Sequence, residues 1–221
     1  SMGCVLDPRD IVLTTGTTEA ISLCLGALLK PGDTVALESP TSFGFLQILE
    51  ALKLRALEIP THPRFGLSVD ALALALRDAR VDAILATPTL SNPMGTIMPM
   101  GERERLVELL TRHRVPLIED VIYNDLAVND SHRRAVKSFD KDGWVLTCSS
   151  YSKTVAPGLR VGWLHAGRFR DQVRKLKSAF SGGNCAVNEL TLTELLAESN
   201  YSRQLRRLNK INRLGLQEAR R

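Results

Sequence analysis

Short apolar runs alternate with amphipathic stretches along most of this chain. The apolar runs predict strands at residues 11–13, 34–37, 54–59, 83–86, 115–118, 145–148 and 161–164. Apolar residues at helical spacing predict helices at about 19–29, up to residue 52, from a cap at Ser68 to about 78, and at 102–113, with further helical patterns from 168 onward. This alternation predicts an α/β fold, a mainly parallel sheet with helices on both faces.

Ligands bind such sheets beyond the carboxyl ends of the strands, and a lysine stands at one of them. Lys153 follows the run 145–148 and is flanked by small hydroxyl residues. A lysine attacks an aldehyde once desolvation or a neighbouring charge lowers its pKa. Ser150, Ser152 and Arg160 can hold a phosphate, because arginine offers a planar fork of donors. An exposed loop lysine is the plainer alternative, and this motif alone does not exclude it.

Two further strand ends carry polar residues. Asp120 ends an apolar run, where a carboxylate can pair with a protonated pyridine nitrogen, and Tyr123 could hydrogen-bond a phenolic oxygen. Asn92 stands before Pro93, which holds it extended and aims its amide in a fixed direction. Each has a structural alternative, since aspartate often caps a turn and Asn-Pro is common in turns.

The first predicted strand leads into a helix through Gly16, Thr17 and Thr18. Free backbone N–H groups and hydroxyls at a helix N-terminus form a natural phosphate site. A simple threonine cap is the structural alternative.

Composition excludes several other classes. The chain has 221 residues, 44% of them hydrophobic, and no apolar run approaches the roughly 18 residues of a membrane span. No signal peptide is visible at its start. The four cysteines show neither metal-ligand spacing nor a disulfide framework, so we expect reduced thiols, no metal and a cytoplasmic protein.

The net charge of +5 is concentrated near the end of the chain, at Arg203, Arg206, Arg207, Lys210, Arg213, Arg220 and Arg221. These residues alternate with Leu205, Leu208, Ile211 and Leu214 at helical spacing, which favours the solvated face of a helix over direct DNA binding.

Together and in this order, the four motifs resemble the fold-type I pyridoxal-phosphate enzymes, specifically the class I/II aminotransferases. The segments Ser39–Gln47, Ile59–Pro63, Asn92–Thr96 and Ser152–Arg160 are similar to the MocR-type branch of the GntR transcriptional regulators. Members of that branch join a winged-helix DNA-binding domain to an aminotransferase-like domain. The resemblance covers nearly the whole chain.

The resemblance implies a role for each matching residue. Lys153 would form the Schiff base with pyridoxal 5'-phosphate, and Asp120 would hold the ring nitrogen. Asn92 and Tyr123 would bond the ring hydroxyl. The phosphate would be held by Gly16, Thr17, Thr18, Ser150, Ser152 and Arg160. The family stacks an aromatic ring on the cofactor where this chain has Ser42, and the neighbouring Phe43 is a candidate to take over the contact.

The resemblance also implies a larger protein. We expect residues 1–221 to be the pyridoxal-phosphate-binding large domain, without the N-terminal segment and the C-terminal small domain that brings a substrate-binding arginine. Fold-type I proteins usually bind cofactor at a dimer interface, so a homodimer is expected for the full-length protein, with DNA bound only through a domain absent from this chain.

Three functions remain open at this point. The chain is a sensor of an amino-acid or amine ligand within a regulator, the core of a working aminotransferase, or a relative that has lost the cofactor. The third is disfavoured because Lys153, Asp120, Asn92, Tyr123 and Arg160 are all present. The wording of the motifs favours the sensor within a transcriptional regulator.

Overall fold

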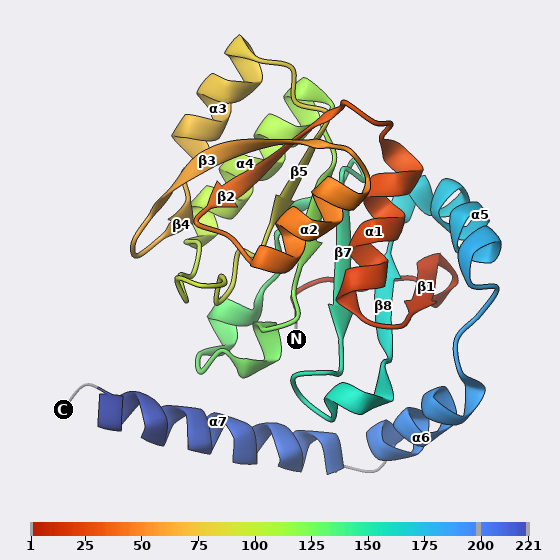
Figure 1. Ribbon diagram of the computed structural model, residues 1–221. Helices are drawn as coiled ribbons and strands as arrows, with labels where there is room; N and C mark the ends of the chain where they lie inside the picture. Colours follow the sequence, from red (N-terminus) through yellow and green to blue (C-terminus); the bar gives the residue numbers. More distant parts are fainter. Residues whose placement is uncertain (1, 198–199, 220–221) are drawn as a thin grey trace.

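The computed structural model describes residues 2–197 and 200–219, which form one mixed sheet flanked by helices (Figure 1). The strand order is β1-β8-β7-β6-β5-β2-β3-β4. The strands are β1 (Ile11–Thr14), β2 (Thr34–Ser39), β3 (Arg55–His62), β4 (Gly66–Leu67), β5 (Ala83–Ala86), β6 (Leu117–Asp120), β7 (Val145–Ser150) and β8 (Gly162–His165). The five strands from β7 to β3 are parallel, whereas β8 pairs antiparallel with β7 and β1, and β4 with β3. The predicted fold class is confirmed.

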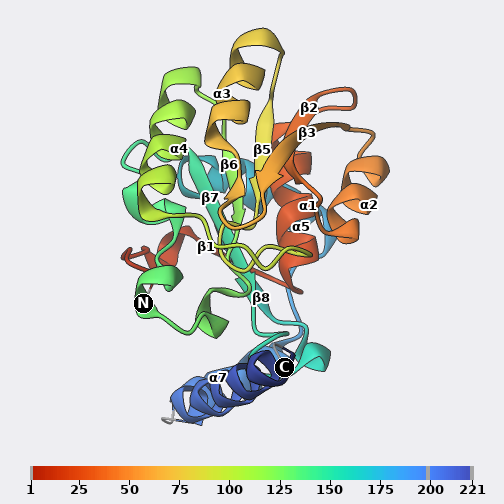
Figure 2. The same ribbon diagram turned by 90° about the vertical axis from the view of Figure 1, so that its left-hand side faces the viewer.

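Helices cover both faces of the sheet, as Figure 2 shows. They are α1 (Thr17–Leu28), α2 (Phe43–Ala51), α3 (Val69–Asp78), α4 (Met100–His113), α5 (Arg170–Phe180), α6 (Ala186–Ala197) and α7 (Asn200–Ala219). Side chains of a strand alternate between the faces, so Val35 and Leu37 belong to a core cluster with residues of α1, α2 and α5, whereas Ala36 belongs to a second cluster with residues of α3 and α4. The sheet therefore has an apolar core on each side.

Some element boundaries differ from the sequence prediction. The sixth strand begins at Leu117 rather than Val115, since Pro116 has no N–H for the ladder; its carbonyl instead accepts a bond from the Ile84 N–H at 2.9 Å. The short strand β4 was not predicted. Ser68 caps α3 as expected, because its hydroxyl accepts from the Ala71 N–H at 3.2 Å.

The basic segment near the end of the chain forms α7, as its periodicity predicts. Arg203, Arg206, Arg207, Lys210 and Arg213 are exposed, so these residues form a solvated face; Arg220 and Arg221 lie outside the described residues. The apolar positions of α7 are only partly covered, since Ile211 is 54% and Leu214 51% exposed. None of the helices in the described ranges is both long and apolar enough to cross a membrane.

A buried arginine on α4 holds the loop that carries Asn92. Arg103 is fully buried. Its Nε donates to the Met98 carbonyl at 3.0 Å, and Nη2 donates to Thr89 Oγ1 at 2.9 Å and to the Pro88 carbonyl at 3.4 Å. Its Nη1 donates to the Arg134 carbonyl. One guanidinium thus satisfies carbonyl groups on two loops beside the carboxyl end of the sheet.

Replacing this arginine should cost much of the stability of the fold. We expect Arg103→Met to lower the free energy of unfolding by about 3 kcal/mol, because buried carbonyl groups lose their donors. Arg105→Met is the matched control on the same helix: Arg105 makes exposed ion pairs with Asp70 and Glu102, which solvent screens, so this variant should change stability little. Chemical denaturation measures both variants, and equal losses would contradict this account of Arg103.

Candidate functional site

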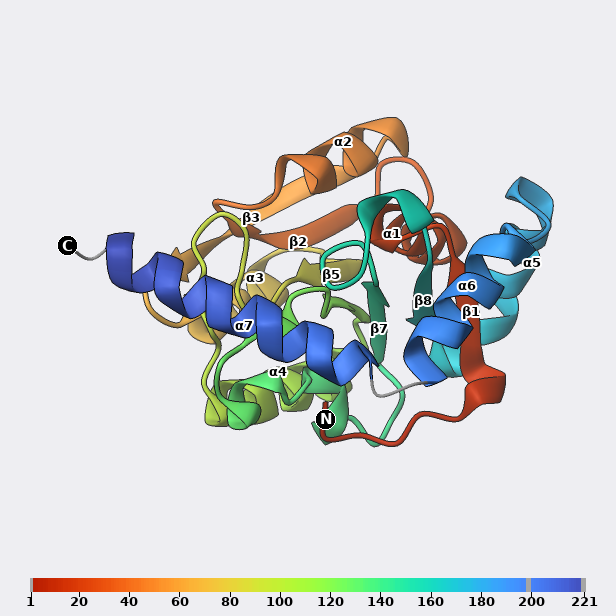
Figure 3. The same ribbon diagram turned by 90° about the horizontal axis from the view of Figure 1, so that it is seen from below.

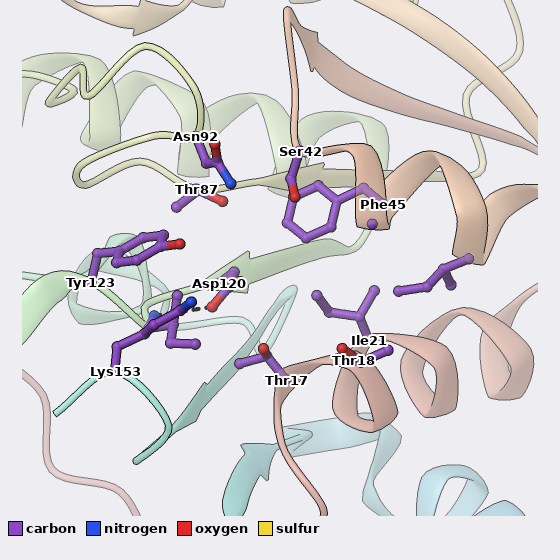
Figure 4. Close-up of a pocket in the computed structure, with 13 residues that line it drawn as sticks. Thr17, Thr18, Ile21, Ser42, Phe45, Thr87, Asn92, Asp120, Tyr123 and Lys153 are labelled. Carbon is purple, nitrogen blue, oxygen red and sulfur yellow. Dashed lines mark hydrogen bonds between the residues drawn. The ribbon is translucent and has the colours of Figure 1, made fainter. Parts of the chain in front are cut away.

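A cavity of about 190 Å³ lies at the carboxyl ends of the parallel strands, and Figure 4 shows its lining. The walls come from the start of α1, the start of α2 and the segments that follow β5, β6 and β7. The lining residues are Thr17, Thr18, Ile21, Ser42, Gly44, Phe45, Ile48, Thr87, Asn92, Asp120, Ile122, Tyr123 and Lys153. The structure therefore brings together seven residues that the sequence singled out from five separate segments.

Asp120 is the buried acid of this cavity. It ends β6, and its Oδ1 accepts from the Ile122 N–H at 3.0 Å. Burial raises the pKa of Asp120 from 3.8 to about 7; the backbone bond from Ile122 opposes that rise, the Glu119 carboxylate adds to it, and the positive charge of Lys153 lowers it. A buried carboxylate of this kind is best satisfied by a cation or a protonated ligand.

Lys153 lies on the tight turn after β7. The turn is closed by the Val155 N–H, which donates to the Tyr151 carbonyl at 2.8 Å. The side chain of Lys153 points into the cavity toward Asp120 (Figure 4), while remaining accessible to solvent. An amine in this position can meet a ligand that enters from solvent while a carboxylate lies opposite it.

Asn92 and Tyr123 lie on the same side of the cavity (Figure 4). The Asn92 loop is closed by a bridge between Thr89 and Ile97 and by a 2.6 Å bond between the hydroxyls of Ser91 and Thr96. Burial and the charge of Asp120 raise the pKa of Tyr123, which keeps its hydroxyl protonated. An amide and a phenol hydroxyl are thus both present in the cavity wall.

The first turn of α1 has the properties of an anion site. Gly16 caps this helix without any side-chain hydrogen bond, and Thr17 and Thr18 line the cavity. Gly16 has a φ of +120°, and a Cβ there would lie 2.9 Å from Arg160 Nη2, so a larger residue would push the guanidinium away. Four donors of the predicted phosphate site, counting Arg160, are thus at one place.

The two serines of the motif lie between the end of β7 and Lys153. Ser150 is buried at the end of β7, and its Oγ accepts from the Ser152 N–H at 3.4 Å. The Ser152 hydroxyl is buried and has no hydrogen-bond partner among the described residues. An orphaned buried hydroxyl directly before Lys153 is a donor available to a ligand oxygen.

A partly buried ion pair anchors the start of α1. Glu19 Oε2 accepts from the Thr15 N–H at 2.6 Å, and Lys177 Nζ on α5 donates to both Glu19 oxygens at 2.9 and 3.0 Å. Lys177 also donates to Asn184 Oδ1 at 2.7 Å. Neither Glu19 nor Lys177 stood out in the sequence, since they are far apart along the chain and belong to ordinary helical patterns.

The aromatic contact is where the structure departs most from expectation. Ser42 lines the cavity, but Phe43 is 71% exposed and is not brought into it. Phe45 is buried and lines the cavity instead. Its spacing with Ile48 and Leu49, the other buried residues of α2, could have shown that Phe45 faces inward.

The fold and the site together define an α/β protein with a lysine and a buried carboxylate facing one cavity at the carboxyl ends of a parallel sheet. Residues 2–215 match the family model described as aminotransferase class I and II, and the chain belongs to this family. The resemblance to this family that the motifs indicated is confirmed.

The similar proteins include some named as transcriptional regulators and some named as aminotransferases. The uncharacterized HTH-type transcriptional regulator YjiR of Escherichia coli (strain K12) is 40% identical over 97% of this chain and 46% of its own length. Aromatic-amino-acid aminotransferase 1 of Thermococcus litoralis is 30% identical over 85% of this chain and 45% of its own length. The chain thus spans about half the length of these relatives.

A solved structure shows the same fold. LysN, an α-aminoadipate aminotransferase from Thermus thermophilus complexed with N-(5'-phosphopyridoxyl)-L-leucine, superposes with a TM-score of 0.84 at 26% identity. The match covers 92% of this chain and 53% of that one.

The buried carboxylate predicts a characteristic dependence of stability on pH. Because the pKa of Asp120 is raised in the folded state, the folded chain keeps a proton that the unfolded chain releases between about pH 4 and pH 7. The free energy of unfolding should therefore fall as pH rises through this window. Glu38, whose pKa burial also raises to about 7, contributes in the same direction.

We expect Asp120→Asn to stabilise the ligand-free chain at pH 8 by roughly 2 kcal/mol, since the neutral amide retains an acceptor for Ile122 and carries no buried charge. Urea denaturation at several pH values measures the effect. Asp171→Asn, at an exposed carboxylate, is the control and should change little. If the stability of Asp120→Asn depended on pH as that of the wild type does, the raised pKa of Asp120 would be refuted.

Proposed function

We propose that this chain binds pyridoxal 5'-phosphate covalently through Lys153, as the effector-sensing module of a GntR/MocR-type transcriptional regulator. The observation that carries the proposal is that Lys153 and the buried Asp120 face one cavity. The similarity to YjiR, which is named as an HTH-type regulator, supports the second half of it.

The residues fit the cofactor chemically at each of its four polar groups. The aldehyde needs an amine, which Lys153 supplies, and the pyridine nitrogen needs a carboxylate, which Asp120 supplies at a place where burial otherwise disfavours its charge. Asn92 and Tyr123 would hold the ring hydroxyl. The phosphate oxygens would accept hydrogen bonds from the uncapped N–H groups of α1, from the unpartnered hydroxyl of Ser152 and from Arg160.

The apolar walls fit the ring itself. Ile21, Phe45, Ile48 and Ile122 line the cavity, and we propose that Phe45, rather than Phe43, covers part of the ring. Ser42 would contact the cofactor through its small hydroxyl.

When bound, the cofactor supplies an electron sink for charge that develops on an amino-acid Cα. Asp120 would keep the proton on the ring nitrogen. Lys153 Nζ is the group able to accept a proton from that Cα as a general base. The same groups serve sensing and transamination, so chemistry at the cavity does not separate the two functions.

The alternative function is the catalytic core of a free class I/II aminotransferase, which would transfer an amino group between an amino acid and a 2-oxo acid. The similarity to an aromatic-amino-acid aminotransferase favours it. For the whole protein we propose a cytoplasmic homodimer, an amino-acid or amine ligand, and DNA contact through a domain outside this chain.

Cofactor addition followed by reduction tests the central assignment. The chain mixed with pyridoxal 5'-phosphate should develop an absorbance band at roughly 400–430 nm, and borohydride should fix the label on Lys153. Lys153→Ala should lose both the band and the label. Lys175→Ala, at an exposed lysine of α5, should keep both. A label on another lysine in the wild-type chain, located by peptide mass spectrometry, would overturn the proposal.

A second experiment separates the two functions and uses the full-length gene product. It would be supplied with cofactor and a panel of amino acids, while the spectrum, the 2-oxo acid released and the binding to promoter DNA are measured. A regulator should change its spectrum and its DNA affinity without sustained 2-oxo acid production. Sustained turnover without any DNA binding would favour the aminotransferase.

A further inference from the structure

The helix α7 lies against the loops at the carboxyl ends of β6 and β7, far from the sheet core. Figure 1 shows it below these loops, and Figure 3 shows it crossing them. It contacts the short helix η2 (Asn124–Leu126), which follows Tyr123.

Tyr201 of α7 makes two hydrogen bonds to these loops. The Tyr201 hydroxyl donates to Asp125 Oδ2 at 2.7 Å and makes a second hydrogen bond to Thr154 Oγ1 at 3.2 Å. The Tyr201 ring also meets the ring of Tyr151 edge-on, with the centroids 5.9 Å apart. Burial raises the pKa of Tyr201, so its hydroxyl keeps the proton that it donates.

The two segments that Tyr201 joins are those that present the reacting groups. Thr154 is buried and directly follows Lys153, whereas Asp125 comes two residues after Tyr123. Thr154 thus belongs to the turn after β7, and Asp125 belongs to the segment after the neighbouring strand β6. A second side chain of α7 also contacts Asp125, since Asn209 Nδ2 donates to the Asp125 carbonyl at 3.4 Å.

We propose that Tyr201 is a positioning residue, whose hydroxyl bridges these two segments and so sets the place of the Lys153 amine relative to Asp120 and Tyr123. The inference rests on the proposed function for its consequence in cofactor binding. Because α7 carries the bridge, any shift of α7 would move the turn of Lys153, and a ligand that moves this turn would shift α7. Such coupling between two places is reciprocal.

Tyr201→Phe tests the bridge, because it removes the hydroxyl and keeps the ring against Tyr151. We expect amide hydrogen exchange to become several-fold faster in peptides covering 150–156 and 124–127, and to stay unchanged in α3 and α4. We also expect affinity for pyridoxal 5'-phosphate to fall by about tenfold and the pH midpoint of its absorbance band to move. Ser202→Ala, at the next and exposed position of α7, is the matched control and should match the wild type.

Asp125→Ala should reproduce the effect from the other side of the bridge. The double variant should lose little more than either single variant, because both remove the same link. A Tyr201→Phe chain that melts at a lower temperature but keeps the wild-type exchange rates, cofactor affinity and pH midpoint would show a purely structural role and overturn the inference.

The exchange measurement needs no cofactor, so it separates this inference from the proposed function. If the wild-type chain forms no absorbance band, the proposed function fails, and the exchange rates still decide whether Tyr201 holds the turn of Lys153. If the band forms and Tyr201→Phe changes neither exchange nor affinity, only the bridge fails.

Discussion

The burial of the Asp120 carboxylate at the end of β6 is the constraint around which the site is arranged. Burial raises its pKa, and only nearby positive charge or hydrogen-bond donors oppose that effect. The neighbouring parallel strand β7 leads directly into the turn of Lys153, so the amine and the carboxylate meet at one edge of the sheet. The cavity therefore presents a buried carboxylate and a solvent-accessible amine side by side.

The residues that hold this arrangement come from outside the strands that display it. Arg103 reaches from α4 to the loop of Asn92, and Lys177 reaches from α5 to Glu19 at the start of α1. Tyr201 reaches from α7 to the turn of Lys153. Each is a buried or half-buried polar group with several partners, and such groups favour one loop conformation because the alternatives leave donors or acceptors unsatisfied.

Much of the fold and the chemistry could be predicted from local patterns. The apolar runs located seven of the strands, and the polar residues at their ends located Asp120, Asn92 and Lys153 in the cavity. This works because a parallel sheet places all its carboxyl ends at one edge, whatever the contacts elsewhere. The aromatic residue of the cavity was harder to predict: Phe43 and Phe45 are close in sequence, and only the orientation of α2 decides that Phe45 lines the cavity and Phe43 does not.

The sequence by itself determined the class of fold, the family and the polar side chains that line the cavity, because these depend on periodicity and on residue types at strand ends. Only the tertiary structure decided which distant residues support them. Glu19 and Lys177 are 158 residues apart, and Asp125 and Tyr201 are 76 apart. Such pairs leave no periodic signal, since their contact results from how whole helices pack against the sheet and not from the spacing of neighbouring residues.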